Sequence, residues 1–174
     1  MNKEEINTLI EKKHETLFNW IYSQPEEKWN EAPENKRTVG QQIAHLVESI
    51  KQVNHAMSFP PFILKYKFGT SNRDVRDYDD IVKRYQEKLA KHQEKAKEFN
   101  ANLGIPDLKQ RKKLLNTLQI QQKKLQHKTN RWKDHNLNNL ILPHPLMGKM
   151  PIREIIMWTA YHTEHHTNDL VNNY

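Results

Sequence analysis

The residues best suited to chemistry are histidines near the C-terminal end, in the run Tyr161-His162-Thr163-Glu164-His165-His166. His162 and His166 are four apart, so on an α-helix they lie one turn apart on the same face. That face also carries Ile155 and Leu170, so both imidazoles would point into a core, where their nitrogens need partners. A divalent metal ion would satisfy them. An isolated H-x-x-x-H is nevertheless a weak signal, and ordinarily packed histidines are the alternative.

A third ligand must come from elsewhere in the chain, and His45 is the candidate. It lies beside the apolar stripe of an earlier predicted helix, flanked by Gln42 and Ser49. Such a polar strip suits a water-filled cavity between helices. From these residues alone, a hydrogen-bonded histidine at the core boundary is the favoured alternative. His165 projects away from the stripe of the last helix and is expected to be exposed or to neighbour a ligand.

The remaining histidines and one nearby carboxylate are given ordinary roles. Three histidines lie in helices without a second ligand type at a suggestive spacing and are read as surface or packed residues: His14, His92 and His127. His55 and His135 lie near helix ends, where solvation or capping is expected. No catalytic residue is assigned. His144 and Glu48 are the residues to test as proton carriers, although a structural role is favoured for both.

The elements that must position these residues are predicted to be helices. Only four glycines occur, which favours long helices over a turn-rich β fold. Apolar residues at helical spacing predict helices over about 3–22, 38–57, 78–99, 108–132 and from Pro151 onward. Thr38-Val39-Gly40-Gln41 matches a capping box at the start of the second helix. No β-sheet of consequence is expected, and four residues are predicted to be buried: Leu46, Ile50, Leu118 and Ile155.

Two segments lack a helical period and are predicted to be connections. Residues 59–68 contain two prolines and several aromatics, and we expect them to cap one end of the bundle. Residues 142–148 are read as a loop into the last helix, with Pro151 in its first turn, where a missing N–H costs nothing.

Composition limits the class of protein. The 174 residues fit one domain, 1–174, that can bury a core without disulfides. The absence of cysteine removes thiolates as ligands or nucleophiles and fits a reducing compartment. The N-terminus lacks the apolar run of a signal peptide, and no stretch approaches the ~20 apolar residues that span a bilayer. A cytoplasmic protein is expected.

The net charge of +7 is unevenly distributed. Residues 83–134 hold 15 Lys/Arg against five Asp/Glu. Such a surplus could serve an anionic partner such as nucleic acid. Solvated outer faces of amphipathic helices give the same count, however, and they are the favoured interpretation.

Three motifs together resemble the DinB-like (DinB/YfiT-like) family: residues 38–46, residues 144–150 and residues 162–166. The resemblance implies an all-α fold, an up-down-down-up four-helix bundle with an additional helix. It implies that His45, His162 and His166 bind a divalent transition metal, zinc or nickel. It also implies a small-molecule substrate, because characterised relatives include transferases that use low-molecular-weight thiols, and a homodimer, because relatives often pair through bundle helices.

Three classes of function follow. The first, which is favoured, is a metal-dependent transferase using a low-molecular-weight thiol on small electrophiles, with a metal-dependent hydrolase beside it. The second is a non-catalytic metal-binding or stress-response module. The third, least favoured, is a DNA-associated protein. An open coordination position distinguishes the first class from the second. Steep salt dependence of duplex binding would mark the third.

Overall fold

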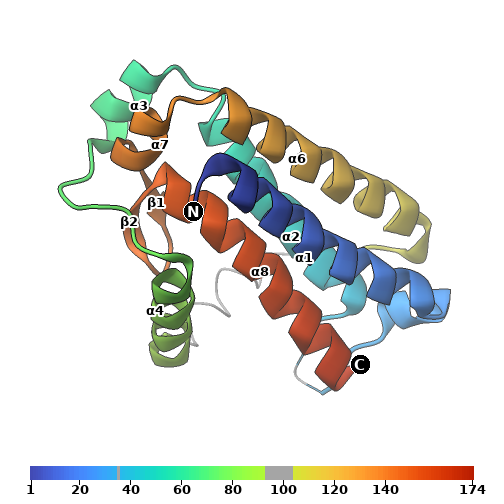
Figure 1. The fold of residues 1–174 in the computed structure, drawn as a ribbon. Helices are drawn as coiled ribbons and strands as arrows, with labels where there is room; N and C mark the ends of the chain where they lie inside the picture. The colour runs from blue at the N-terminus through green and yellow to red at the C-terminus, as the bar shows by residue number, and fades with distance from the viewer. Residues whose placement is uncertain (35, 93–103) are drawn as a thin grey trace.

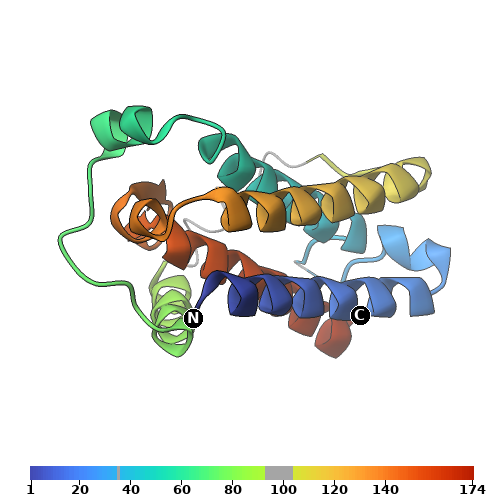
Figure 2. The same cartoon turned by 45° about the horizontal axis from the view of Figure 1, so that its top comes forward.

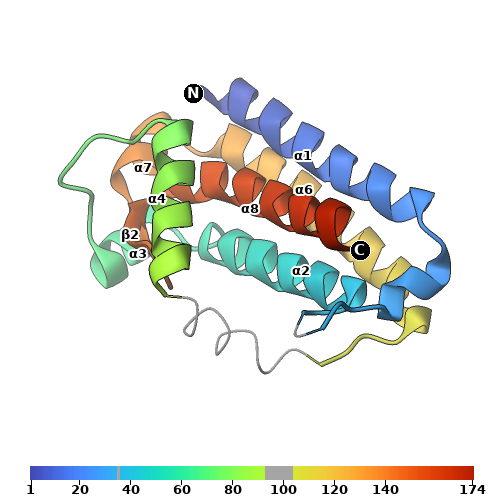
Figure 3. The same cartoon turned by 90° about the horizontal axis from the view of Figure 1, so that it is seen from below.

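The computed structural model describes residues 1–34, 36–92 and 104–174, and its four long helices form a bundle (Figure 1). These helices are α1 (Lys3–Ser23), α2 (Val39–Ala56), α6 (Arg111–Arg131) and α8 (Ile152–Asn173). α1 and α8 run in one direction and α2 and α6 in the other (Figure 3). The predicted all-α fold with up-down-down-up order is therefore confirmed.

The shorter elements gather mostly at one end of the bundle (Figures 1 and 2). The connection from α2 to α6 contains α3 (Pro61–Phe68) and α4 (Tyr78–Lys91), and α4 packs across α8 (Figure 3). Between α6 and α8 come α7 (Asp134–Asn139) and an antiparallel hairpin of β1 (Ile141–His144) and β2 (Gly148–Pro151). Two short 3-10 turns, η1 (Glu26–Asn30) and η2 (Leu108–Gln110), meet near the opposite end.

The start of α2 is fixed by its cap and by close packing. Thr38 and Gln41 form the predicted capping box: each side chain accepts a hydrogen bond from the backbone N–H of the other. A Cβ at Gly40 would come within 2.7 Å of the Trp29 ring, so glycine permits the contact between η1 and α2. These two features set where α2 begins and hence which of its residues face α8.

α8 is the central helix of the molecule. Residues 152–163 are all buried because α1, α2, α4, α7 and the hairpin surround this helix. The four residues predicted to lie in the core have exposed fractions between 0% and 4%, which confirms that prediction: Leu46, Ile50, Leu118 and Ile155. Any polar group that α8 carries on this stretch must therefore find a partner inside the protein.

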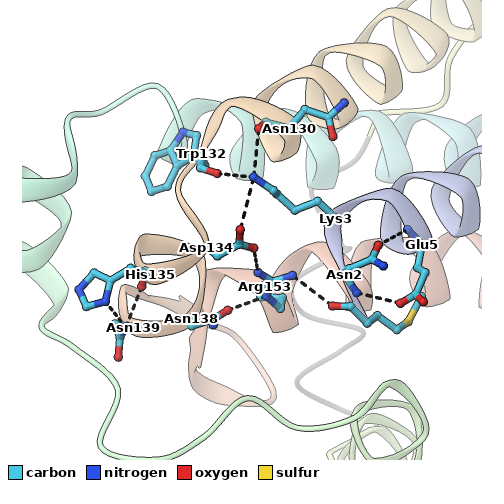
Figure 4. A network of polar contacts seen from close by, with 11 residues as sticks. Asn2, Lys3, Glu5, Asn130, Trp132, Asp134, His135, Asn138, Asn139 and Arg153 are labelled. Carbon is cyan, nitrogen blue, oxygen red and sulfur yellow. Dashed lines mark hydrogen bonds and ion pairs between the residues drawn. The ribbon is translucent and has the colours of Figure 1, made fainter.

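A polar network holds the N-terminal end of α8 (Figure 4). Arg153 is 6% exposed and donates hydrogen bonds to Asp134, to Asn138 Oδ1 at 2.6 Å and to the carbonyl of Met1 at 3.1 Å. Lys3 donates to the carbonyl of Trp132 at 3.1 Å and also lies 3.5 Å from Asp134 Oδ2. The network ties α1, α6, α7 and α8 together and fixes the end from which α8 extends toward the histidines.

Several local predictions were wrong. Residues 59–68 were expected to lack a helix, but Pro61 begins α3, because proline is well tolerated in the first turn. The short helix has apolar residues all round it, which hides the helical period. The expected loop at 142–148 belongs to a hairpin: residues 142–144 lie in β1, Gly148 begins β2, and only 145–147 form the turn. α7 and η1 were not predicted, and Pro151 precedes α8 as its N-cap.

The other boundaries match closely. α1 begins at Lys3 as predicted, and residues 108–110 form η2 directly before α6. The predicted helix 78–99 is confirmed as α4 up to Lys91, and its remaining part falls mainly on 93–103, outside the described residues. No helix among the described residues has the length and apolar character needed to cross a membrane.

α3 leaves aromatic surface uncovered. Phe62 and Tyr66 of α3 are 72% and 95% exposed, and Phe59, just before this helix, is 39% exposed, whereas Leu64 of α3 is buried. Apolar groups gathered on a surface often mark a contact with a partner. The homodimer stays a prediction.

Candidate metal centre

The three histidines singled out in the sequence meet between α2 and α8. His45 comes from α2, and His162 and His166 lie one turn apart on α8. Nε2 of His162 is 3.0 Å from Nε2 of His45 and 3.1 Å from Nε2 of His166. The prediction that the three side chains converge is confirmed, and among the described residues they form the group of potential metal ligands.

The spacing of these nitrogens suits a small divalent ion. Zinc–nitrogen bonds of ~2.0–2.1 Å at tetrahedral angles place two ligand nitrogens about 3.3–3.4 Å apart. The contacts of 3.0 and 3.1 Å at His162 are close to that separation. Imidazole nitrogens suit zinc, nickel and other transition ions, so the donor set and its spacing both fit a metal.

The protons available to the three imidazoles also favour a cation. Nδ1 of His166 lies 2.8 Å from Oε1 of Gln42, which only accepts hydrogen bonds, so this nitrogen carries the proton of the neutral ring. Nε2 of His166 therefore presents a lone pair. Without a metal, a single proton on Nε2 of His162 would have to form hydrogen bonds to both His45 and His166. A metal ion accepts the lone pairs of all three nitrogens.

Gln42 is held in the orientation that His166 requires. Its Nε2 donates to Asp169 Oδ2 at 2.9 Å and to the hydroxyl of Tyr174 at 3.1 Å, which leaves Oε1 to face the histidine. Lys36 bonds the other oxygen of Asp169 at 2.6 Å. Partners of this kind fix the tautomer and ring orientation of a metal-binding histidine.

Replacing Gln42 with leucine is expected to weaken binding of a divalent metal by roughly 10–100-fold, because His166 loses the acceptor that fixes its tautomer. Isothermal titration of the metal-free protein with zinc measures this affinity. Gln52→Leu, an exposed change on the same helix, is the matched control and should bind as the unaltered protein does. Equal affinities for Gln42→Leu and this control would contradict the role of Gln42.

His162 is fixed by two further contacts. Its Nδ1 lies 3.3 Å from Oγ of Ser49, and donation to that oxygen leaves Nε2 facing the other two imidazoles. The indole of Trp158, one turn earlier on α8, stacks on the His162 ring with centroids 4.5 Å apart and planes 18° apart. The polar strip noted beside His45 thus supplies partners to both α8 histidines through Gln42 and Ser49.

Burial keeps the three imidazoles neutral. It lowers the pKa of His45 to about 4, with a smaller contribution from the charge of Arg37. It also holds the pKa values of His162 and His166 well below their ordinary value, and the neighbouring histidines lower them further. Neutral imidazole is the form that binds metal, so protons compete weakly at neutral pH.

The histidines given ordinary roles lie outside the convergent group. His165 is half-buried, and its ring packs against those of Tyr85 at 6.1 Å and Tyr161 at 6.2 Å. His14 is buried in α1, where its Nδ1 bonds the carbonyl of Ile10 at 2.8 Å. The other four are exposed or half-buried: His55, His127 and His135 are exposed and His92 is half-buried.

Among the described residues, no hydrogen bond joins either candidate proton carrier to the triad. Glu48 is exposed and forms an ion pair with Lys51 at 2.8 Å, so it faces solvent as expected. His144 is buried in the hairpin, where its Nδ1 accepts from the backbone N–H groups of Leu146 and Met147 at 3.1 Å. Burial lowers its pKa to about 4, so it is a neutral residue that shapes the turn.

Some residues around the site were missed in the sequence, and most of them carry no usable signal there. Trp158 could have been placed by its spacing of four from His162. Asp169 and Tyr174 reach the site through Gln42, and nothing in the spacing of these three predicts that contact. The carbonyl of Arg37 accepts a hydrogen bond from the same Tyr174, and the charge of Arg37 lowers the pKa of His45 and His166.

Comparison with protein families identifies the family to which the chain belongs. Residues 9–170 match the DinB superfamily, and this span contains all three histidines and nearly all of the four bundle helices. Comparisons with curated proteins and with solved structures gave no match. The match over most of the chain, together with the fold and the buried histidine group, shows that the chain belongs to the DinB superfamily.

Proposed function

We propose that the protein is a divalent-metal-dependent transferase that uses a low-molecular-weight thiol on small electrophiles. The observation that carries the proposal is a site of three neutral imidazoles, from His45, His162 and His166, which no carboxylate joins among the described residues. Three protein ligands leave room for water or substrate, the arrangement of catalytic sites. A bound zinc or nickel ion would supply a Lewis acid that lowers the pKa of a thiol.

One side of this site is accessible to a ligand, and neighbouring side chains hold the imidazoles in place. His162 and His166 are 3% and 9% exposed, whereas His45 is half-buried, so access is from the His45 side. Gln42 and Ser49 hold the α8 imidazoles in place, and Trp158 covers one face of His162. Because the chain has no cysteine, the sulfur would come from a cosubstrate.

Small thiols are expected to change the visible spectrum of the cobalt-substituted protein, because sulfur ligation adds charge-transfer bands. Titration of the cobalt protein with 2-mercaptoethanol measures this change. His45→Ala should lose the change, since it removes one of three ligands, whereas His127→Ala replaces an exposed histidine and should keep it. If cobalt stays bound and no thiol alters the spectrum, the transferase proposal gives way to hydrolysis or to a non-catalytic site.

A further inference from the structure

α3 is held to the end of the bundle by one side only. It packs mainly against β1, and a β-bridge between Thr70 and Leu140 follows it. Leu64 is buried and Phe68 packs against the core, so these two side chains attach the helix from its inner side. In each view α3 lies at the outer edge of the molecule (Figures 1, 2 and 3). Its other side therefore faces outward.

The outward side of α3 carries two large aromatic rings. At about 100° per residue, Phe62 and Tyr66 lie close together on the side opposite Leu64. The two residues are 72% and 95% exposed, and Phe59, just before the helix, is 39% exposed. A group of exposed rings on a helix that packs by its other side indicates a surface that meets a partner.

Lysines surround these rings. Lys65 and Lys67 are exposed, and their positions on the helix lie on either side of Phe62 and Tyr66. Lys149 of β2 is also exposed, and its Nζ reaches the carbonyl of Phe68 at the end of α3 at 3.4 Å. We call the following residues the α3 patch: Phe62, Lys65, Tyr66, Lys67 and Lys149.

No negative charge of the chain balances the α3 patch locally. Residues 49–73 contain no Asp or Glu. Among the ion pairs of the described residues, none includes a lysine of the patch. The lysines therefore complement a partner that brings negative charge.

This charge argues against a second copy of the chain as the partner. A twofold dimer joins the same patch of both subunits. Pairing two α3 patches would bring the lysines of both copies together, and residues 49–73 supply no carboxylate between them. Like charges placed opposite one another weaken an interface. An anionic surface has no such penalty.

We propose that the α3 patch binds the surface of a membrane that contains anionic lipids. Aromatic rings are favoured at the boundary between headgroups and acyl chains, and lysines beside them reach the lipid phosphates. The eight residues of α3 are too few to cross a bilayer, so the helix lies on it. A lipid surface adapts to a protruding helix, whereas an acidic protein would need a groove of matching shape.

The charge of the patch is tested by sedimenting the full chain with vesicles. One set is phosphatidylcholine alone, and the other is equal parts phosphatidylcholine and phosphatidylglycerol. The chain should bind the second set more tightly, and added salt should weaken binding. Replacing both Lys65 and Lys67 with glutamine should lower this affinity about 25-fold, since each lysine near an anionic surface contributes roughly five-fold. Lys112→Gln with Lys113→Gln removes the same charge from exposed positions at the opposite end of the bundle and should have little effect.

The aromatic part of the patch is tested in the same way. Tyr66→Ala should weaken binding to the phosphatidylglycerol vesicles roughly 10-fold, because a ring no longer leaves water. Tyr22→Ala is the matched control, because Tyr22 is 63% exposed at the end of α1, away from α3. It should bind as the unaltered protein does. Thermal unfolding confirms that each variant is folded.

Three results would overturn the proposal. The first is a chain that sediments with neither set of vesicles. The second is an equal loss from the two lysine pairs, which would show only the general attraction of a chain of net charge +7. The third is a dimer that Tyr66→Ala dissociates, without vesicle binding, which would assign the patch to a second copy. None of these measurements involves the histidine triad, so the outcome is independent of the proposed function.

Discussion

Replacing His162 or His166 with alanine is expected to abolish stoichiometric binding of a divalent metal. His162 is the most sensitive position, because its Nε2 contacts both other imidazoles at 3.0 and 3.1 Å. Removing it leaves two nitrogens on different helices and an empty volume between them. Two imidazoles do not hold zinc with the affinity of three, and the remaining buried nitrogens lose their shared partner.

Elemental analysis after loading with zinc and desalting measures this effect as metal per chain. The unaltered protein should retain about one ion, and each alanine variant should retain almost none. His165→Ala is the matched control, because His165 lies beside His166 in sequence but outside the convergent group. It should keep its metal. Stoichiometric zinc in His162→Ala, or its loss in His165→Ala, would show that the ligands have been misassigned.

Replacing Glu154 with glutamine is expected to lower the free energy of unfolding by about 3 kcal/mol. The side chain of Glu154 is 0% exposed near the start of α8. Arg73 donates to both of its oxygens at 2.5 and 2.8 Å, and the backbone N–H and guanidinium of Arg76 donate at 2.8 and 3.3 Å. An amide keeps the shape but replaces one acceptor oxygen by a donor that faces these donors.

The expected loss is at the lower end for a buried ion pair, because both arginines are partly exposed and can recover water. It corresponds to a fall in Tm of roughly 6–12 °C for a chain of this size. Thermal and urea unfolding, followed by circular dichroism, measure it. Glu48→Gln, which breaks an exposed ion pair with Lys51, is the control and should change stability by less than ~0.5 kcal/mol. Equal effects would mean that the Glu154 contacts contribute little.

The difference in stability between the unaltered protein and Glu154→Gln is also expected to depend on pH. Burial raises the pKa of Glu154, but hydrogen bonds from Arg73 and Arg76 and the charges of both more than offset it, so the net pKa lies below the ordinary 4.5. A depressed pKa stabilises the folded state above the unfolded value. That contribution is lost as the pH falls through the folded value. The advantage over Glu154→Gln should therefore be constant near neutrality and shrink below about pH 4.5.

The sequence alone determined the long helices and two of the three candidate ligands. The apolar stripes of α1, α2, α6 and α8 are local patterns, because side-chain position on a helix follows from spacing. For the same reason His162 and His166 had to share a face of one helix. The capping box at Thr38 is equally local, since its partners are three residues apart.

The assignment of His45 as the third candidate ligand was less secure, because it depends on how α2 and α8 pack. From its own neighbours, His45 was better read as a boundary histidine, and only the family resemblance joined it to α8. α3 and the hairpin were missed for a related reason. Proline, aromatic and turn residues in 59–68 and 142–148 are compatible with several local structures, and packing against the end of the bundle selects among them.

Only the tertiary structure decided what surrounds the triad. It brought Asp169 and Tyr174 to Gln42, and Gln42 to His166, across separations of more than a hundred residues. It also joined the carbonyl of Arg37, just before α2, to the hydroxyl of Tyr174, which Gln42 also contacts. Hydrogen bonds and charges between distant segments leave no periodic trace in a sequence. They depend on the crossing of α2 and α8, which the shapes of many buried side chains set together.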